Sequence, residues 1–228
     1  MYKVFVKRLL DIILSSLMIV ICLPLMIIIA LIIKKDGGSA IFIQKRSGKD
    51  NDPFMIYKFR TMHIENDVHD FKCEDRITKF GKFLKRTSLD ELPQLFNILK
   101  GDMSFIGPRP WITDYSKYYT LNQMKRLSVK PGLTGLAQCC GRNSLSIIEK
   151  INYDLEYVED VSFINDIKIV FLTIKSLLDK DSASTTKFTI KSELDELKKQ
   201  TRYQNIIFNS KYENATPLLS RNIYKWKI

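Results

Sequence analysis

An uncharged apolar run near the N-terminus constrains this chain more than any other feature. Residues Ile12 to Ile33 form 22 consecutive positions without Asp, Glu, Lys or Arg. As one straight helix the run would be about 33 Å long, which is enough to cross the hydrocarbon core of a bilayer. A cleaved signal peptide fits poorly, because the run is long and no small-residue cleavage site follows it. The run therefore predicts a helix that either spans a membrane or enters and leaves by the same face.

The two ends and the middle of this run bear on its topology. Pro24 lies near the middle, where its missing N–H and its clash with the carbonyl of Val20 predict a kink. Both flanks are basic, and the positive-inside rule then draws both ends to the cytoplasm; the flanking residues are Lys3, Lys7, Arg8, Lys34 and Lys35. From these residues alone, the re-entrant and the spanning topology are about equally favoured.

The charge of the chain predicts an anionic partner. Lys and Arg number 36 against 25 Asp and Glu, a formal net charge of +11, which suits an anionic membrane, a phosphorylated small molecule or a nucleic acid. A nucleic-acid partner fits poorly, because its binding needs charge that follows a groove and the apolar run has no place in such a surface. The cysteines, at positions 22, 73, 139 and 140, have no metal-site or disulfide spacing. We interpret them as reduced thiols, and His63 and His69 as solvated surface residues.

Short periodic segments predict the elements that follow the apolar run. Alternating β-formers predict strands at Ala40 to Gln44 and Phe54 to Phe59. Helical spacing of apolar residues predicts helices at Pro93 to Leu99 and Phe163 to Leu178, and a further helix is expected near Lys191 to Lys199. The basic, Phe-containing stretch Lys79 to Arg86 suits either a membrane surface or a half-buried amphipathic helix.

Two adjacent carboxylates precede the helix expected at Pro93. Proline is tolerated in a first helical turn but not deeper, so Pro93 places Asp90 and Glu91 close to the helix N-terminus. The helix dipole there would lower a carboxylate pKa and attract phosphate. A carboxylate kept ionised beside phosphate can act as a nucleophile or hold Mg²⁺. Alternatively, Ser88 and Glu91 have the spacing of a capping box, in which Glu91 would only bond the backbone N–H of Ser88.

Basic residues in strands and turns favour the chemical interpretation of this acidic pair. Arg109 lies in Gly107-Pro108-Arg109-Pro110, where two prolines limit backbone freedom and suit a preorganised guanidinium clamp on phosphate. Together with the acidic pair and the apolar run, such cations predict a site for a phosphorylated substrate with a lipid partner. The candidate phosphate-binding cations are Lys58, Arg60, Lys85, Arg86, Arg109 and Arg142.

Four blocks of this sequence resemble the bacterial sugar transferases. More narrowly, they are similar to the small monotopic polyprenyl-phosphate phosphoglycosyl transferases, and the resemblance runs from Tyr2 to Leu178. It implies a helix-rich α+β fold in which residues 1–35 form a re-entrant helix anchor broken at Pro24. It also implies one cytosolic catalytic domain at residues 36–182, on the cytoplasmic face of the bacterial inner membrane. Residues 183–228 are then a C-terminal extension without an assigned role. The blocks are Lys58 to Met62, Thr87 to Leu95, Leu99 to Pro110 and Lys130 to Asn143.

The same resemblance implies a reaction. Asp90 would attack the β-phosphorus of a UDP-sugar and release UMP, leaving a covalent aspartyl phosphosugar. Polyprenol (undecaprenol) phosphate would then take the phosphosugar, as a first membrane step of glycoconjugate or polysaccharide assembly. Glu91 would support a metal or the acceptor phosphate, and Mg²⁺ would be the cofactor, with Asp90 as a ligand. Arg109 and Arg142 match the phosphate- and nucleotide-contacting arginines of the family, and Lys58 matches another basic residue of its site.

The chain also departs from the family pattern. Leu23 stands where the family often has Ser, so the kink would rest on Pro24 alone or on Ser15 or Ser16. Lys85 stands where the family commonly has Arg, and either Lys85 or the neighbouring Arg86 could fill that role. Two other functions remain possible from the residues: a membrane phosphatase that passes the phosphoryl group to water, and a peripheral scaffold that binds anionic lipid without catalysis.

Overall fold

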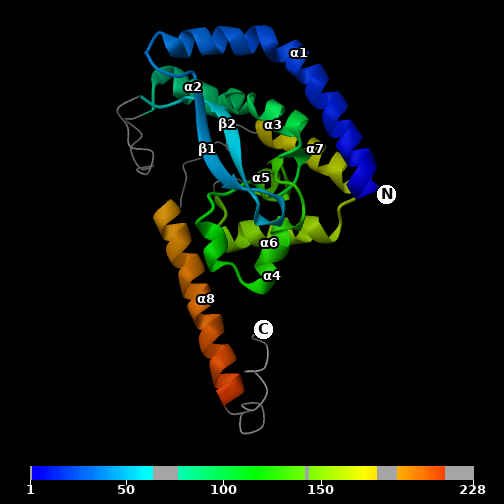
Figure 1. Cartoon of the computed structure of the whole chain (residues 1–228), viewed down its shortest axis with the longest axis vertical. Coiled ribbons are helices and arrows are strands. Elements are labelled where there is room, and N and C mark those ends of the chain that lie inside the picture. Colours follow the sequence, from blue (N-terminus) through cyan, green and yellow to red (C-terminus); the bar gives the residue numbers. More distant parts are fainter. Residues whose placement is uncertain (1, 64–76, 142–143, 179–188, 214–228) are drawn as a thin grey trace, which may run out of the picture.

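The apolar run folds into a single helix, α1 (Lys7–Lys34), in the computed structural model of the protein. The structure describes residues 2–63, 77–141, 144–178 and 189–213. Figure 1 shows α1 arching over the remaining elements and changing direction along its course, with Pro24 inside the helix. Within the described residues, α1 is the one helix that is long and apolar enough to cross a membrane.

The N-terminal end of α1 is bonded to the domain beneath it. The guanidinium of Arg8 donates hydrogen bonds of 2.7 Å to the carbonyls of both Ile98 and Leu99. Lys7 forms an ion pair with Asp166 of helix α7 (Phe163–Leu178). The two Arg8 bonds place positive charge on carbonyls at the C-terminal end of a helix, which is the favourable end for a cation.

The C-terminal end of α1 is bonded to the same domain. Arg60 donates to the carbonyls of Ile33 and Gly37, at 3.1 Å and 2.5 Å, where α1 ends. Buried side chains in the second half of α1, among them Ile33, pack in one cluster with Phe59 and Leu84. Both ends of the helix are therefore held by the domain that it covers.

The remaining elements form a helix-rich α+β fold with two small sheets, as predicted. Strands β1 (Ile41–Ser47) and β2 (Pro53–Phe59) pair antiparallel, and β3 (Ser104–Ile106) pairs parallel with β4 (Gly132–Thr134). Both strands expected from the sequence are confirmed, and β1 runs three residues further than expected because it stays paired with β2. The helices after α1 are α2 (Lys79–Thr87), α3 (Gln94–Lys100), α4 (Leu121–Met124), α5 (Leu136–Cys140), α6 (Ile147–Glu159), α7 (Phe163–Leu178) and α8 (Ile190–Glu213).

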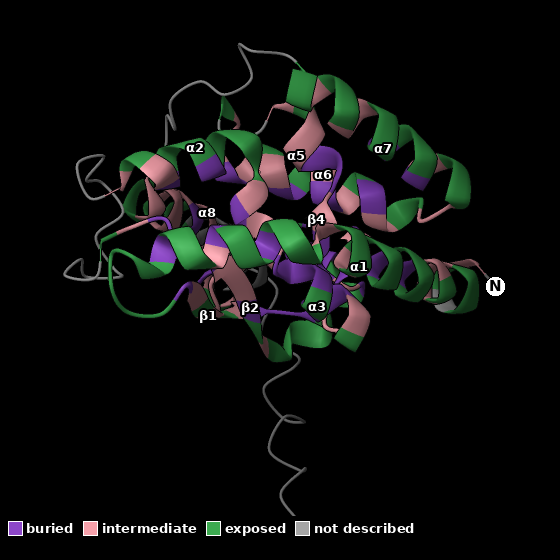
Figure 2. Ribbon diagram, turned by 90° about the horizontal axis from the view of Figure 1, so that it is seen from above, coloured by how far each residue is buried: buried purple, intermediate pink, exposed green. Residues whose placement is uncertain are grey.

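Exposed apolar side chains gather on α1 and α7. Figure 2 shows both helices with most of their surface exposed. On α7, Ile164 and Phe171 are exposed while Ile169 is fully buried, so this helix turns an apolar face outward as well as inward. Helix α2 combines the two alternatives left open by its sequence, because Leu84 is buried in the domain and Phe83 is exposed. Such surfaces suit contact with lipid.

Helix α8 ties the start of the C-terminal extension to the domain. Leu197 is fully buried in a cluster with side chains of α6. The Glu193 carboxylate accepts hydrogen bonds from the Tyr115 hydroxyl and the Lys150 ammonium, each at 2.7 Å. The helix expected near Lys191 to Lys199 is confirmed and is longer than expected, since its first part is stabilised by this packing.

Candidate functional site

A left-handed residue sets the position of the acidic pair. Ser88 follows helix α2 with φ +57°, and the next residues form a single turn of 3₁₀ helix, η4 (Leu89–Glu91). A positive φ is uncommon for a residue other than glycine and is often found at functional sites. This turn redirects the chain between α2 and α3, so that Asp90 and Glu91 lie at the junction of the two helices.

The capping-box interpretation of Ser88 and Glu91 is wrong. The Ser88 side chain makes no cap hydrogen bond. The Glu91 carboxylate instead accepts hydrogen bonds from Lys58 Nζ at 2.6 Å and from Arg109 Nη2 at 3.0 Å, both to Oε1. Charge-assisted bonds to two cations are stronger than a bond to one backbone N–H, so tertiary partners decide the orientation of Glu91.

Asn97, which sequence reasoning missed, joins strand β2 to helix α3. Its side-chain amide donates to the carbonyl of Met55 at 2.7 Å and accepts from the backbone N–H of Tyr57 at 3.0 Å. Asn97 is fully buried, and a buried amide of this kind needs such partners. The bridge holds the strand that carries Lys58 against the segment that carries Glu91.

The Arg109 loop is fixed by close backbone contacts between β3 and β4. Gly107 N–H donates to the carbonyl of Thr134, and Gly132 N–H donates to the carbonyl of Pro108, each at 2.9 Å. A Cβ atom at Gly132 would lie 2.1 Å from the nitrogen of Gly107 and 2.3 Å from the oxygen of Thr134. The two glycines are therefore needed for the approach that positions Arg109.

Gly132→Ala should destabilise the protein by about 1–3 kcal/mol, because both clashing atoms belong to the backbone and the strands must separate. We also expect lower activity, since the separation displaces the loop of Arg109. Denaturant unfolding in detergent measures the first effect. A variant as stable as the wild type would show that the β3–β4 contact is looser than the geometry indicates.

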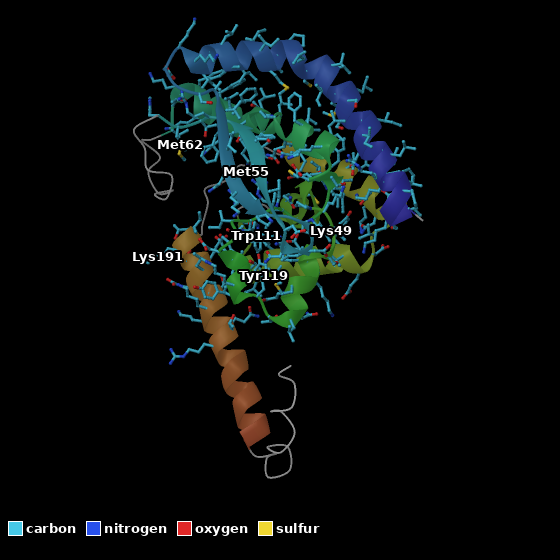
Figure 3. The ribbon with its side chains drawn as sticks, in the orientation of Figure 1. Lys49, Met55, Met62, Trp111, Tyr119 and Lys191 are labelled. Carbon is cyan, nitrogen blue, oxygen red and sulfur yellow. The ribbon has the colours of Figure 1, made fainter. Side chains whose placement is uncertain are left out.

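Arg126, also missed from the sequence, supports the same loop from inside the protein. Its guanidinium donates to the carbonyl of Arg109 at 2.8 Å and to Asp154 Oδ2 from Nη2 and Nε, at 2.7 Å and 3.0 Å. It lies 4.0 Å from the ring centroid of Trp111, which packs beside Tyr119 (Figure 3). Arg126 and Asp154 are each 1% exposed, so the pair acts as a fixed internal support rather than as a solvent-facing bridge.

The pKa values of the two acids shift in opposite directions, although the same cations lower both. Burial alone would raise the pKa of Glu91, but the charges and hydrogen bonds of Arg109 and Lys58 outweigh it and lower this pKa to about 2. Burial raises the pKa of Asp90, and the charge of Glu91 raises it further, against the opposing charges of Lys58 and Arg109. The lowered pKa expected for Asp90 at a helix N-terminus is therefore wrong, since one short turn does not outweigh burial beside a second carboxylate.

The structure also distinguishes the two acids by their partners. The Glu91 carboxylate is committed to two cations, whereas the Asp90 carboxylate accepts no hydrogen bond from any described residue. An ionised carboxylate with few partners and a raised pKa is the better nucleophile, because basicity and nucleophilicity rise together. The geometry thus favours Asp90 for attack and Glu91 for organising the surrounding cations.

The low pKa of Glu91 should be visible in acid stability. An acid whose folded pKa is below its unfolded value of about 4.5 contributes stability that is complete above that pH. This contribution is lost as the pH falls from about 4.5 toward 2. We expect the thermal midpoint to fall more steeply over this range in the wild type than in Glu91→Gln, which should be less stable at pH 7. Parallel curves for the two proteins would contradict the assignment.

The other predicted cations are not all at this site. Lys85 lies close enough for its charge to oppose the rise of the Asp90 pKa, whereas Arg86 forms no hydrogen bond or ion pair with a described residue. Of the two, Lys85 is therefore the cation beside Asp90. The structure does not bring Arg60 to the acidic pair, because its guanidinium binds the end of α1. Arg142 lies outside the described residues.

Arg46 of strand β1 joins the site without having been predicted. Burial, and to a smaller extent the neighbouring charge of Arg109, lower its pKa to about 10 against the opposing effects of Tyr115 and Glu91. Its Nε is buried and has no hydrogen-bond partner among the described residues. An arginine beside Arg109 with an unused donor is suited to an anionic ligand. The sequence offered no signal for it, since Lys45 and Arg46 are adjacent and only the fold decides which points inward.

The donor set at Asp90 is compatible with Mg²⁺. Among the described residues, no three His, Cys, Asp or Glu side chains cluster as a complete metal cage. Mg²⁺ does not need such a cage, because it usually takes one or two carboxylates together with substrate phosphates and water. The uncommitted oxygens of Asp90 fit this mode, and Glu91 is the adjacent second carboxylate.

Residues 2–180 match the family model described as bacterial sugar transferase. The chain belongs to this family. A bacterial sugar transferase named EpsL, from Bacillus subtilis and described as uncharacterized, is 43% identical over 185 residues, which cover 79% of this chain and 91% of that protein. The family resemblance expected from the sequence is thus confirmed.

Two relatives of this bacterial sugar transferase have more specific names. A UDP-glucose:undecaprenyl-phosphate glucose-1-phosphate transferase of Caulobacter vibrioides is 41% identical over 190 residues, 78% of this chain and 71% of that protein. The galactosyl transferase CpsE of Streptococcus agalactiae is 44% identical over 188 residues, 75% of this chain. The match spans only 42% of CpsE, so this chain corresponds to part of that longer protein.

Proposed function

We propose that this bacterial sugar transferase moves a sugar 1-phosphate from a UDP-sugar to polyprenol phosphate, with Asp90 as the nucleophile and UMP as the leaving group. The observation that carries the proposal is the contrast within the acidic pair. Asp90 is buried beside cations yet accepts no hydrogen bond from the described residues, while Glu91 is held by Lys58 and Arg109. Relatives named for undecaprenyl-phosphate sugar transfer support the substrate classes.

In the first step, a carboxylate oxygen of Asp90 forms a bond to the β-phosphorus of the donor. The bond from that phosphorus to the bridging oxygen breaks, and UMP leaves with the electron pair. The attack joins an anion to a doubly charged diphosphate, so nearby positive charge must offset the repulsion. Lys58, Arg109 and Lys85 lie around Asp90 for this purpose, since the positive charge of each lowers the Asp90 pKa.

Arg46 adds a cation close to Arg109, and its unpartnered Nε can bind a phosphate oxygen of the leaving UMP. Mg²⁺, when bound at Asp90, would add positive charge at the diphosphate. In the second step an oxygen of polyprenol phosphate attacks the same phosphorus, and the Asp90 carboxylate leaves, restored. Glu91 keeps Lys58 and Arg109 oriented through both steps, because both cations bond the same oxygen.

The contacts of α1 support a re-entrant topology on the cytoplasmic face. A straight helix of 28 residues spans about 42 Å, so a spanning α1 would place its ends on opposite sides of a bilayer. Here Arg8 near the beginning and Ile33 near the end are both bonded to the domain that contains Asp90. The change of direction in Figure 1, with Pro24 inside the helix, suits this arrangement, and the exposed apolar face of α7 would lie on the same membrane surface.

The first experiment measures UMP release by the purified protein in nanodiscs with Mg²⁺ and polyprenol phosphate. UDP-glucose and UDP-galactose lead the donor panel, because relatives carry glucose and galactose in their names. With acceptor we expect many turnovers, and without acceptor a burst of at most one UMP per protein. Continued release without acceptor would identify a phosphatase that uses water. No UMP with any donor would leave the lipid-binding scaffold as the function.

A further inference from the structure

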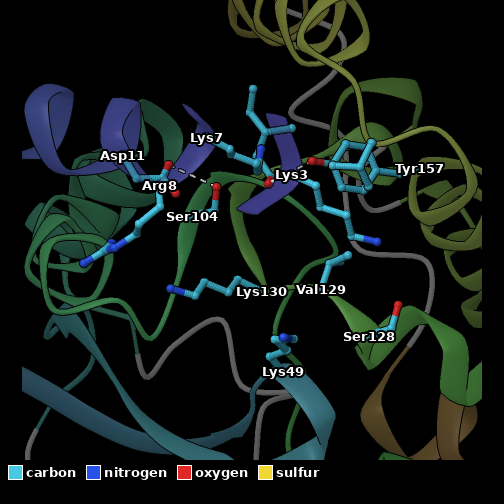
Figure 4. A pocket seen from close by; sticks show the side chains of 12 residues that line it. Lys3, Lys7, Arg8, Asp11, Lys49, Ser104, Ser128, Val129, Lys130 and Tyr157 are labelled. Atoms are coloured by element: carbon cyan, nitrogen blue, oxygen red, sulfur yellow. Dashed lines mark hydrogen bonds between the residues drawn. The ribbon is translucent and has the colours of Figure 1, made fainter. Parts of the chain in front are cut away.

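A basic cavity separate from the acidic pair lies under the N-terminal end of α1. Its volume is about 280 Å³. Figure 4 shows it between the start of α1, the turn before β4 and the loop after β1, with Lys49 and Lys130 facing the residues of α1. It contains neither Asp90, Glu91 nor any cation of their site. The lining cations are Lys3, Lys7, Arg8, Lys49 and Lys130.

The acidic groups near this cavity do not neutralise it. Asp11 is its lining carboxylate, and its Oδ1 is turned to the protein, where it accepts from the Ser104 hydroxyl at 3.0 Å and the backbone N–H of Phe105 at 3.1 Å. Asp166 is paired with Lys7. At least three of the five cations are left without a close carboxylate.

The uncompensated charges are close enough to act on one another. Lys130 forms no hydrogen bond or ion pair with a described residue. Burial lowers its pKa, and so do the neighbouring charges of Arg8 and Lys49, while Asp11 and Asp102 act in the opposite direction. Lys49 has only a distant partner, Asp50 at 3.6 Å, and half of its side chain is exposed. Like charges gathered in a concave site favour an anionic ligand.

Exposed apolar side chains lie close in sequence to the residues that line the cavity. Phe5 and Leu9, which flank Lys7 in sequence, are 74% and 58% exposed. Helix α7 begins with exposed Phe163, which packs against Tyr2, the residue before the cavity-lining Lys3. Apolar side chains that surround a group of lysines are typical of the boundary between acyl chains and phosphate headgroups.

We propose that this cavity binds the phosphate group of a membrane lipid headgroup, with Lys49 and Lys130 as its principal ligands. The phosphate would enter between these two lysines and Lys3, while the acyl chains lie along the exposed apolar side chains of α1 and α7. The bound lipid would fix the height of the domain on the membrane. This site is independent of the proposed transfer reaction, and binding alone tests it.

The test titrates the purified protein in nonionic detergent with dihexanoyl phosphatidylglycerol, using calorimetry. UMP is present throughout to occupy the nucleotide site. Two further titrations use inorganic phosphate and dihexanoylglycerol, which lacks the phosphate. Each is repeated with the double variant Lys49→Gln/Lys130→Gln. The matched control is Lys191→Gln/Lys199→Gln, which removes the same charge from exposed positions of α8.

We expect the phospholipid to bind more tightly than either partial ligand, and the cavity variant to weaken it by about tenfold or more, roughly 1.4 kcal/mol. The control should bind as the wild type does. Equal binding of dihexanoylglycerol would overturn the proposal, since apolar contact alone would then explain it. Inorganic phosphate binding as tightly as the lipid would overturn the assignment to a lipid headgroup. An equal loss of affinity in the control variant would show that the effect arises from the net charge of the protein and not from this cavity.

Discussion

Asp90→Asn should reduce UMP formation by at least about a thousandfold while leaving the protein folded. The substitution keeps the shape of the side chain and removes the charge and the lone pair that attacks phosphorus. Loss of a nucleophile lowers turnover by several orders of magnitude in enzymes that form covalent intermediates. Glu91→Gln should lose less activity than Asp90→Asn, because it leaves the nucleophile in place and weakens only the orientation of Lys58 and Arg109.

The stability of Asp90→Asn gives this prediction a second readout. The pKa of Asp90 is raised in the folded protein, so at neutral pH the ionised group opposes folding. Asn removes that opposition, and we expect an unfolding midpoint at pH 7 equal to or above the wild-type value. The difference should shrink as the pH falls and Asp90 becomes protonated in the wild type. Natural active sites often exchange stability for activity in this way.

The measurement combines UMP release with thermal unfolding in the same detergent. Asp114→Asn is the control, because Asp114 is an exposed carboxylate in a surface pair and its loss should change neither quantity. Activity of Asp90→Asn within tenfold of the wild type would exclude Asp90 as the nucleophile. Loss of activity together with a lower midpoint would make Asp90 a structural residue instead.

Local sequence patterns predicted the helices and strands that are determined by the residues of a single segment. The spacing of Ile164, Ile167 and Phe171 predicted helix α7 over its observed range, and alternating β-formers predicted both strands of the β1–β2 hairpin. These patterns succeed because one segment contains all the residues that set them. The exposed outer face of α7 was beyond such reasoning, since helical spacing alone does not say whether protein or lipid covers it.

The acidic pair of the candidate site could be predicted from the sequence, but only some of the residues that contact it could. Glu91 matched a capping box in its own segment, but Lys58 and Arg109, 33 and 18 residues away, determine its hydrogen bonds. Arg60 follows the same strand as Lys58 and instead binds the end of α1. The hydrogen-bond partners of these side chains could not be predicted from the sequence, because the β1–β2 hairpin and the turn at Ser88 first bring them together.

Arg126 shows most clearly that a local segment does not reveal the long-range partners of its side chains. It follows Lys125 in a basic turn, and nothing in the sequence separates the two residues. In the structure Lys125 is exposed and Arg126 is buried against Asp154, 28 residues further along the chain. The burial of one cation of an adjacent pair depends on a counter-charge from another helix, which only the fold reveals.

Asp154→Asn should therefore destabilise the protein by about 3–5 kcal/mol, because it leaves the buried Arg126 guanidinium without its counter-charge. Denaturant unfolding in detergent measures the loss. Asp114→Asn breaks the exposed pair with Lys117 and should lower the free energy of unfolding by less than about 1 kcal/mol. A loss below 1 kcal/mol in Asp154→Asn as well would show that water reaches the Arg126 site.

The double variant Arg126→Met/Asp154→Leu separates the stability of this pair from its role at the site. Replacing both charges by apolar side chains removes the unpaired ion, so most of the lost stability should return. The Met side chain cannot donate to the carbonyl of Arg109, a bond of 2.8 Å in the wild type. We therefore expect a stable protein whose KM for the UDP-sugar is raised more than its kcat is lowered, because the loop of Arg109 is no longer held in place. A double variant with wild-type kinetics would limit Arg126 to a structural role, and one as unstable as Asp154→Asn would show that packing around the pair, rather than its charge, governs the fold.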